Sequence, residues 1–365
     1  MHTDFLYRPP RRLMIAALQF CLSGAAAIAD STEAPPPATP DPAVEMMKPC
    51  SEGNGDPELQ AIACTGLITG GKLQGAQLSA AYVFRGKANA RRRQLKAAIA
   101  DFTAALKIEV RAADALYNRG AAHALLGRYD LALADFGKVL ELAPNDADTL
   151  YYRAGIYAAQ GRDDAAIKDL TAVLKDHPYD RLSLIDRGGI YIRTGQYDAA
   201  IVDFTALVEG DRKSADSYYN RGRAYYATGN FAAAAADFTA AMQNRDANPY
   251  AAIRLYLAQA QAGKAETKPL EVTAQKFDPE QWPLPIVALI LGKITEADLL
   301  QAIKVENAAV AKSLACETQY YLGELALIKG DKTAAKGHFQ ASVASGMQSS
   351  IEYIDATAEL KRLGG

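Results

Sequence analysis

The chain has 365 residues and a formal net charge of −2, which excludes a strong overall attraction to nucleic acids or other polyanions. Half of the residues are hydrophobic and tyrosine occurs 19 times, whereas the chain has one tryptophan and four histidines. With so few histidines, a histidine-based metal cluster is not expected.

The N-terminus has the pattern of an export signal over residues 1–29. Arg8, Arg11 and Arg12 precede an apolar run, and small Ala27 and Ala29 precede the expected cleavage site. The alternative is an uncleaved membrane anchor, because a run of about 17 residues is at the short end of the lengths that span a bilayer. Cys21 follows Phe20 instead of a small residue, which disfavours lipidation. We expect a periplasmic or secreted protein.

Residues 30–49 are rich in proline and are predicted to form an extended linker. Folding is expected from Cys50, which is well placed to form a disulfide with Cys64 in an oxidising compartment. A bridge across such a loop stabilises a fold by about 3 kcal/mol. Cys316 lies in a helical pattern and is interpreted as a buried structural thiol.

Residues 50–78 are predicted to be an N-terminal capping region with a helix that begins at Pro57 behind the N-cap residue Asp56. One apolar face of this helix is expected to pack inward. That face consists of Leu59, Ile62, Ala63 and Leu67.

Five units of 34 residues follow over residues 79–248, and the tetrapeptide YNRG, at residues 117–120 and again at 219–222, marks their period. The units begin at Ser79, Ala113, Ala147, Arg181 and Ala215. Position eight is small (Gly86, Gly120, Ala154, Gly188, Gly222), position twenty is alanine (Ala98, Ala132, Ala166, Ala200, Ala234), and position twenty-four is large (Phe102, Phe136, Leu170, Phe204, Phe238). Position fifteen is a turn glycine in four units: Gly127, Gly161, Gly195 and Gly229.

These columns resemble the tetratricopeptide repeat. A further unit fits at residues 316–349, with Gly323, Gly330, Ala335 and Phe339 in the matching columns. The resemblance implies an all-α fold, a solenoid of helical hairpins with extra C-terminal helices, in which stacking makes one continuous core.

Two further columns depart from the usual repeat pattern, because position seven is always arginine and position twenty-three is always aspartate. The arginines are Arg85, Arg119, Arg153, Arg187 and Arg221, and the aspartates are Asp101, Asp135, Asp169, Asp203 and Asp237. They are predicted to form structural ion pairs, either within each hairpin or between successive hairpins. The alternative is an arginine stripe that grips an acidic ligand, which the aspartates would neutralise.

The concave groove of this repeat family is lined by the first helix of each hairpin. The matching columns here are rich in tyrosine and asparagine: Tyr117, Asn118, Tyr151, Tyr152, Tyr219, Asn220, Arg223 and Tyr226. Tyrosine offers a large apolar area with a polar tip, so we expect these residues to bind partner polypeptides. The alternative is that several of them pack between helices. The family's carboxylate clamp for chaperone C-termini is not matched.

Nothing in the sequence indicates catalysis, and neither a cofactor nor a metal is expected. The stretch Gly66–Leu73 has the spacing of a phosphate loop, but Leu73 replaces the required serine or threonine and no strand precedes it. The run Arg91–Arg93 falls where the first unit should turn. It is interpreted as a solvated basic loop, with contact to an acidic partner or lipid surface as the alternative.

The C-terminal third is divided into a non-repeat helical region, 249–315, and a further repeat-like unit with a capping helix, 316–365. Residues 249–364 resemble the new lipoprotein I family of Gram-negative envelope adaptors. The resemblance is carried by Trp282, Ile286, Val287, Leu291, Gly292, Ile294, Glu296, Tyr321, Leu322, Gly323, Gly330, Asp331, Ala335, Phe339, Glu352, Tyr353, Glu359 and Leu360. It implies a helical periplasmic scaffold, often a homodimer, that brings a protease together with a peptidoglycan hydrolase.

The sequence therefore predicts a non-catalytic adaptor of the cell envelope that binds other proteins or peptides and no nucleic acid. The competing interpretation is a structural envelope component that assembles with itself.

Overall fold

The computed structural model describes residues 42–52, 55–244 and 248–364, and the predicted signal peptide and most of the predicted linker lie outside this part of the chain. The described residues form nineteen α-helices and no strand, so the predicted all-helical class is confirmed. The helices belong to two compact units that adjoin in sequence at Asp176 and His177.

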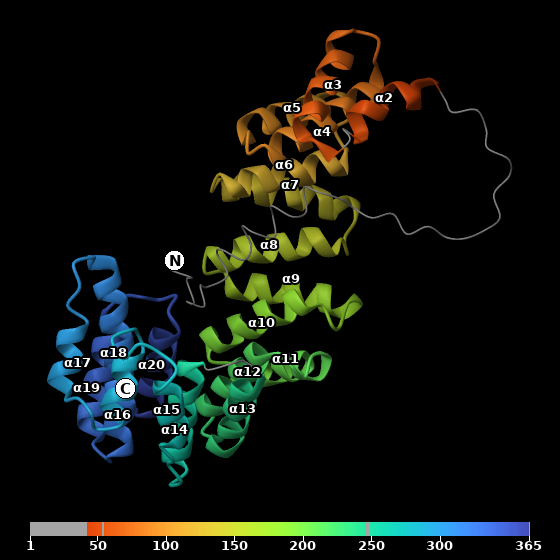
Figure 1. Ribbon diagram of the computed structural model, residues 1–365. Helices are drawn as coiled ribbons and strands as arrows, with labels where there is room; N and C mark the ends of the chain where they lie inside the picture. Colours follow the sequence, from red (N-terminus) through yellow and green to blue (C-terminus); the bar gives the residue numbers. More distant parts are fainter. Residues whose placement is uncertain (1–41, 53–54, 245–247, 365) are drawn as a thin grey trace. The chain divides into compact units, whose positions relative to one another are not determined.

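The N-terminal unit, up to Asp176, is a series of helices in which neighbours along the chain pack against each other (Figure 1). Its helices are α2 (Pro42–Glu52), α3 (Pro57–Thr69), α4 (Gly75–Arg91), α5 (Leu95–Ile108), α6 (Ala113–Leu125), α7 (Tyr129–Leu142), α8 (Ala147–Ala159) and α9 (Asp163–Asp176). The hairpins α4/α5, α6/α7 and α8/α9 are the first three predicted repeats.

The C-terminal unit begins with two more repeat hairpins, α10/α11 and α12/α13, and continues into less regular helices. Its helices are α10 (Arg181–Thr194), α11 (Tyr197–Gly210), α12 (Ala215–Ala227), α13 (Phe231–Asn244), α14 (Pro249–Gln261), α15 (Lys268–Ala274), α16 (Leu284–Ile290), α17 (Glu296–Ala302), α18 (Ala308–Ile328), α19 (Lys332–Ala344) and α20 (Ile351–Arg362). Helices α14, α18 and α20 share one hydrophobic core with α12.

The 34-residue period is visible in the helix ends. Asp146, Asp180, Ser214 and Asn248 follow one another at this spacing, and each caps the helix that follows it by accepting from a backbone N–H group. The turn glycines at position fifteen have positive φ angles between 71° and 78°, which glycine adopts without steric cost.

Within each hairpin, the two helices meet at positions eight and twenty-four. A Cβ atom added to Gly120 would lie 2.9 Å from the ring of Phe136, so only a glycine leaves room for this phenylalanine. The third repeat has Ala154 at position eight and the smaller Leu170 at position twenty-four. The hairpin α18/α19 repeats the glycine contact, because a Cβ at Gly323 would lie 2.6 Å from Phe339.

The capping helix α3 differs from its prediction. Asp56 caps it as expected, by accepting from the backbone N–H of Glu58 at 2.7 Å. The buried face, however, is Gln60, Ala61 and Cys64, while the predicted inward residues Leu59 and Ile62 are 53% and 61% exposed. The disulfide through Cys64 fixes which side of the helix faces α2, and this constraint overrides the apolar pattern.

Two boundaries also differ from their predicted places. Helix α2 begins at Pro42, inside the predicted linker, because Met46 and Met47 pack against the core around Cys50. Helix α18 begins at Ala308 instead of Cys316, because Asn307 caps it by accepting from the backbone N–H groups of Ala309 and Val310.

Candidate functional site

Each position-seven arginine pairs with the aspartate of its own hairpin, sixteen residues later. In the third repeat, Arg153 Nε and Nη2 donate to the two carboxylate oxygens of Asp169 at 2.7 and 2.8 Å. The same two-bond contact joins Arg119 to Asp135, Arg187 to Asp203, and Arg221 to Asp237, and Arg85 likewise pairs with Asp101. The aspartate side chains are 2–7% exposed and the arginine side chains 16–23% exposed. The pairs therefore lie at the edge of the core.

Three of these arginines also donate a hydrogen bond to a threonine on a preceding helix. Arg119 Nη1 donates to Thr103 Oγ1 at 3.3 Å, and Arg221 Nη1 donates to Thr205 Oγ1 at 3.4 Å. Arg85 makes the same contact with Thr65 of α3 at 3.3 Å. Of the two predicted alternatives, the structure has the ion pair within each hairpin, and the contact with the preceding helices is a hydrogen bond to threonine.

Hydrogen bonding to Asp169 raises the pKa of Arg153 above its ordinary value, although burial acts in the opposite direction. The pKa values of Arg119, Arg187 and Arg221 are raised for the same reason. These arginines stay charged, and their best donors are already committed to aspartate. This arrangement favours a structural role over capture of an acidic ligand.

Tyrosines that the sequence interpretation missed flank the pairs. Tyr82 and Tyr218 lie three residues before a position-seven arginine, and Tyr157, Tyr191 and Tyr225 lie four residues after one. The guanidinium carbons lie 5.4–5.8 Å from these ring centroids. The helical spacing of three and four residues was the signal that could have identified them.

In the N-terminal unit, the predicted groove residues form an aromatic cluster between hairpins. The ring centroids of Tyr117 and Tyr152 are 5.9 Å apart, and those of Tyr151 and Tyr152 are 5.6 Å apart. Asn118, Tyr151 and Tyr152 are buried, whereas Tyr117 is partly exposed. The three buried residues pack between helices, which is the alternative interpretation of these columns.

In the C-terminal unit, two predicted groove residues are bonded to the chain's own C-terminal helices. Arg223 pairs with Asp355 of α20 at 2.8 Å, and the Tyr226 hydroxyl donates to Glu324 of α18 at 2.5 Å. Arg223, Tyr226 and Asn220 are buried, and Tyr219 is partly exposed. The prediction that Arg223 and Tyr226 line a surface open to a partner is therefore wrong, because α20 packs against α12.

Asp355 is the centre of a buried charge cluster that no sequence pattern indicated. Its carboxylate lies between Arg223 and Arg254, and Arg254 Nη2 forms a 2.7 Å ion pair with it. Arg254 is 1% exposed, donates through Nη1 to the Tyr320 hydroxyl at 2.6 Å, and stacks over the Tyr320 ring at 4.7 Å. The cluster joins helices α12, α14, α18 and α20.

Burial and the two arginines act in opposite directions on Asp355. Burial alone would raise the pKa of Asp355, but Arg223 and Arg254 outweigh it and lower this pKa. Burial, helped by the neighbouring Glu359, raises the pKa of Glu324 to about 8. The cluster thus holds one stable carboxylate and a second carboxyl group that resists ionisation near neutral pH.

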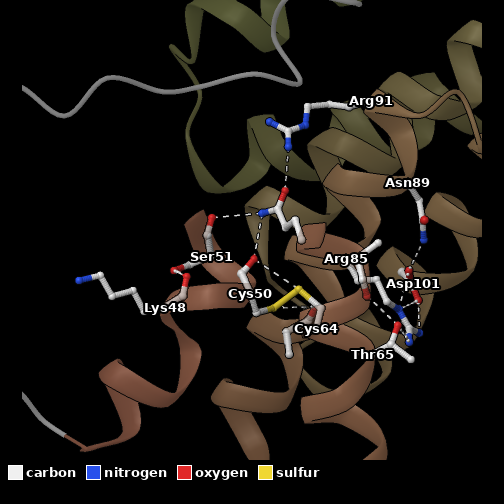
Figure 2. The surroundings of a disulfide bond; sticks show 12 residues. Lys48, Cys50, Ser51, Cys64, Thr65, Arg85, Asn89, Arg91 and Asp101 are labelled. Atoms are coloured by element: carbon white, nitrogen blue, oxygen red, sulfur yellow. Dashed lines mark hydrogen bonds and ion pairs between the residues drawn. A yellow bond between two sulfur atoms is a disulfide. The ribbon is translucent and has the colours of Figure 1, made fainter. Parts of the chain in front are cut away.

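Figure 2 shows the N-terminal cap, where the predicted disulfide between Cys50 and Cys64 is confirmed. Gln60 Nε2 donates to the carbonyl oxygens of Cys50 and Ser51 at 2.9 and 3.1 Å, and Gln60 Oε1 accepts from Arg91 at 3.0 Å (Figure 2). The disulfide and Gln60 together tie α2, α3 and α4. Cys316 is a free, buried thiol whose sulfur lies 3.4 Å from the hydroxyls of Ser342 and Ser350.

Within the described ranges, no three His, Cys, Asp or Glu side chains are grouped to hold a metal ion. The described helices include none that is long and apolar enough to cross a membrane.

Comparison with known proteins identifies the repeats. Models of the tetratricopeptide repeat match residues 113–146, 148–178 and 185–252. These matches confirm the predicted repeats over those residues, whereas the resemblance of residues 249–364 to the new lipoprotein I family stays a prediction.

Solved structures with similar folds include three repeat proteins. YrrB, described as "a TPR protein with an unusual peptide-binding site", is 23% identical, with a TM-score of 0.46 over 52% of this chain and 96% of that chain. A tetratricopeptide repeat protein from Parabacteroides merdae is 17% identical, with a TM-score of 0.47 over 69% of this chain and 98% of that chain. Part of a repeat protein from Cytophaga hutchinsonii is 16% identical, with a TM-score of 0.46 over 75% and 98% of the two chains.

Proposed function

Because residues 113–146, 148–178 and 185–252 are tetratricopeptide repeats, we propose that this chain is a non-catalytic scaffold that binds partner polypeptides. The observation that carries the proposal is the repeated hairpin itself, in which each position-seven arginine pairs with the aspartate of its own hairpin. Within each unit, such regularity keeps side chains on successive hairpins at fixed spacings, and this arrangement suits recognition of an extended peptide or a helix.

Tyr117 and Tyr219 are the residues that we assign to partner contact. They occupy the same position in the second and fifth repeats, and both are partly exposed. Each ring packs against a phenylalanine of its own hairpin, with centroids 5.9 Å apart for Tyr117 and Phe136 and 5.7 Å apart for Tyr219 and Phe238. A tyrosine held in this way loses little conformational entropy on binding.

The proposal places the protein in the cell envelope, in the periplasm or outside the cell. The disulfide between Cys50 and Cys64 supports an oxidising compartment. The resemblance of the C-terminal third suggests an adaptor, often dimeric, that links a protease to a peptidoglycan hydrolase. The competing function is self-assembly into a structural envelope component.

Affinity capture from an envelope extract tests this function. The mature chain is compared with a Tyr117→Ala, Tyr219→Ala double variant and with a Tyr179→Ala control, which removes a tyrosine that is 77% exposed. Circular dichroism checks that both variants remain folded. We expect wild type and control to capture the same protease or hydrolase, identified by mass spectrometry, and the double variant to lose it.

Equal capture by all three forms would contradict the assignment of Tyr117 and Tyr219. If no form captured a partner and sedimentation showed extended oligomers instead, the self-assembly function would replace the adaptor.

A further inference from the structure

The outward side of α3 carries two large apolar side chains that contact little of the described chain. Leu59 is 53% exposed and Ile62 is 61% exposed. They lie three residues apart, so they project from the same side of the helix. This side faces outward because the opposite side is held to α2 by the disulfide at Cys64 and by Gln60 (Figure 2).

The apolar side of α3 has counterparts on α5 and α7, the second helices of the first two hairpins. Thr65 and Thr103 occupy equivalent places, because each accepts a hydrogen bond from the position-seven arginine of the next hairpin. Gly137 has this place on α7. The residues six and three positions before Thr65, Thr103 and Gly137 are all exposed and apolar. We call them the outer stripe: Leu59, Ile62, Ala97, Ala100, Leu131 and Ala134.

The outer stripe is apolar and its surface is uneven. Leu59 and Ile62 on α3 and Leu131 on α7 are its large side chains, and the two alanines on α5 lie between them. A hollow of about 520 Å³ lies between α3 and α5, lined by Ile62, Ala97 and Ala100 and by the Arg85–Asp101 pair. A ridge of side chains from another molecule fits such a recess, whereas a flat surface does not reach into it.

The outer stripe is bordered by four basic and three acidic residues. Arg92 and Arg93 precede α5, Lys96 lies in its first turn, and Arg128 precedes α7. The acidic residues on this border are Asp56, which caps α3, Glu58, which lies 3.4 Å from Arg92 in an ion pair, and Asp130. The excess of positive charge favours an acidic partner.

Arg93 has an unusual backbone conformation. Its φ angle is +60°, and within the described ranges it is the one non-glycine residue with a positive φ. The corresponding turns of later hairpins have glycine there, at Gly127, Gly161, Gly195, Gly229 and Gly330. A non-glycine residue in this conformation lowers the stability of the fold. Arg93 therefore places its exposed side chain at this turn at a cost in folding free energy.

We propose that the outer stripe is a docking surface for an acidic amphipathic helix of a partner protein. The apolar side of that helix packs on Leu59, Ile62 and Leu131, and a leucine or similar side chain enters the hollow beside Ala97 and Ala100. Its carboxylates face Arg92 and Arg93. This surface lies on the second helices of the hairpins and is separate from the positions of Tyr117 and Tyr219.

Fluorescence anisotropy with the full mature chain tests the docking surface. The probe is a labelled amphipathic helical peptide with leucine on one side and glutamate on the other, and a second peptide has lysine in place of glutamate. We expect the glutamate peptide to bind at least tenfold more tightly than the lysine peptide. A Leu59→Glu, Ile62→Glu variant should weaken binding by tenfold or more. Equal binding of the two peptides would overturn the acidic partner.

Val202→Glu is the matched control, because Val202 is 67% exposed on α11 at the place that Ile62 and Ala100 have on their helices. This control should bind the glutamate peptide as wild type does. If it weakened binding as much as the α3 variant, the outer stripe would not be the binding surface.

Arg93→Gly separates the recognition role from a structural role. We expect this variant to have a higher Tm, since the backbone strain is removed, and about threefold weaker binding of the glutamate peptide. A higher Tm with unchanged binding would remove Arg93 from the surface. Sedimentation with phosphatidylglycerol vesicles tests whether the outer stripe binds a lipid surface instead. Binding to the vesicles but not to the peptide would overturn the proposal of a protein partner. None of these variants changes Tyr117 or Tyr219, so the capture experiment fails or succeeds independently.

Discussion

The repeat hairpins and the C-terminal helices pair their buried charges in different ways. In the repeats, each arginine meets an aspartate sixteen residues away, and its side chain stays 16–23% exposed. In the C-terminal helices, Arg254 is 1% exposed, and Asp355, 101 residues later in the chain, lies against it and Arg223. The hairpin α18/α19 has Leu322 and His338 where the repeats have arginine and aspartate.

This contrast shows two uses of ion pairs. A pair at the edge of the core retains some hydration, so it orients neighbouring helices at a modest desolvation cost. In the Asp355 cluster the two arginine side chains are the buried partners, at 5% and 1% exposed, and they share one carboxylate that is 14% exposed, so each charge depends on the others. The first arrangement can be repeated along a chain, whereas the second holds one particular set of helices together.

The largest difference is expected when one partner of each arrangement is removed. Asp355→Ala leaves Arg223 and Arg254 buried without their carboxylate, and we expect the unfolding free energy of the C-terminal unit to fall by about 3–5 kcal/mol. The chain's single tryptophan, Trp282, is packed against this core, so its fluorescence during urea unfolding reports the unit directly. A loss below about 1 kcal/mol would show that the cluster does not hold α20 in place.

The second test is the pH dependence of the stability of the C-terminal unit. The folded pKa of Glu324 is raised from 4.5 to about 8, so its favourable contribution is complete below about pH 4.5 and is lost as the pH rises through about 8. We expect the unfolding free energy of the C-terminal unit to fall by on the order of 3 kcal/mol over this range.

Glu324→Gln should remove most of that decline, because the amide accepts the Tyr226 hydrogen bond without ionising. Trp282 fluorescence at pH 5 to 9 checks this, in a range where Asp355, whose pKa is lowered, stays charged. An unchanged pH slope in the variant would assign the dependence to other groups.

Breaking a repeat pair should have a smaller effect. Arg153→Ala leaves the buried carboxylate of Asp169 without its bidentate partner, and we expect a loss of about 2 kcal/mol in the N-terminal unit. Hydrogen exchange of α8 and α9 measures it, while Trp282 fluorescence should be unaffected. Partner capture should also be nearly unchanged, and the reverse result would show that the arginines bind a ligand.

The smallest expected effect is a gain. Gly137 lies where Thr103 and Thr205 accept a hydrogen bond from the next arginine, and a Cβ added to it meets no atom within 4 Å. Gly137→Thr should raise stability by about 0.5–1 kcal/mol through helix propensity and a bond from Arg153.

Gly137→Ala is the control, since alanine has the higher helix propensity but no hydroxyl. We expect thermal unfolding to show threonine at least as stabilising as alanine. A clear advantage for alanine would mean that the threonine contact contributes nothing.

The sequence by itself determined the repeats, their helix ends and their arginine–aspartate pairs. Every contact of this kind joins residues at a fixed short separation, so a 34-residue period repeats the same local geometry. The caps at Asp146 and Asp180 and the Gly120–Phe136 contact follow from residue types at known spacings. The disulfide was predictable for the same reason, because Cys50 and Cys64 are close in sequence.

Only the tertiary structure decided which predicted surfaces are accessible. The columns that hold Arg223 and Tyr226 are typical of a groove, but Arg223 bonds to α20 and Tyr226 to α18 through contacts across more than 90 residues, which no local spacing encodes. Likewise the apolar pattern of α3 placed Leu59 and Ile62 inside, and the disulfide turned them outward. A helix presents the side that its strongest restraint allows, and for α3 the packing of Cys64 against Cys50 of α2 outweighs the apolar pattern of the helix.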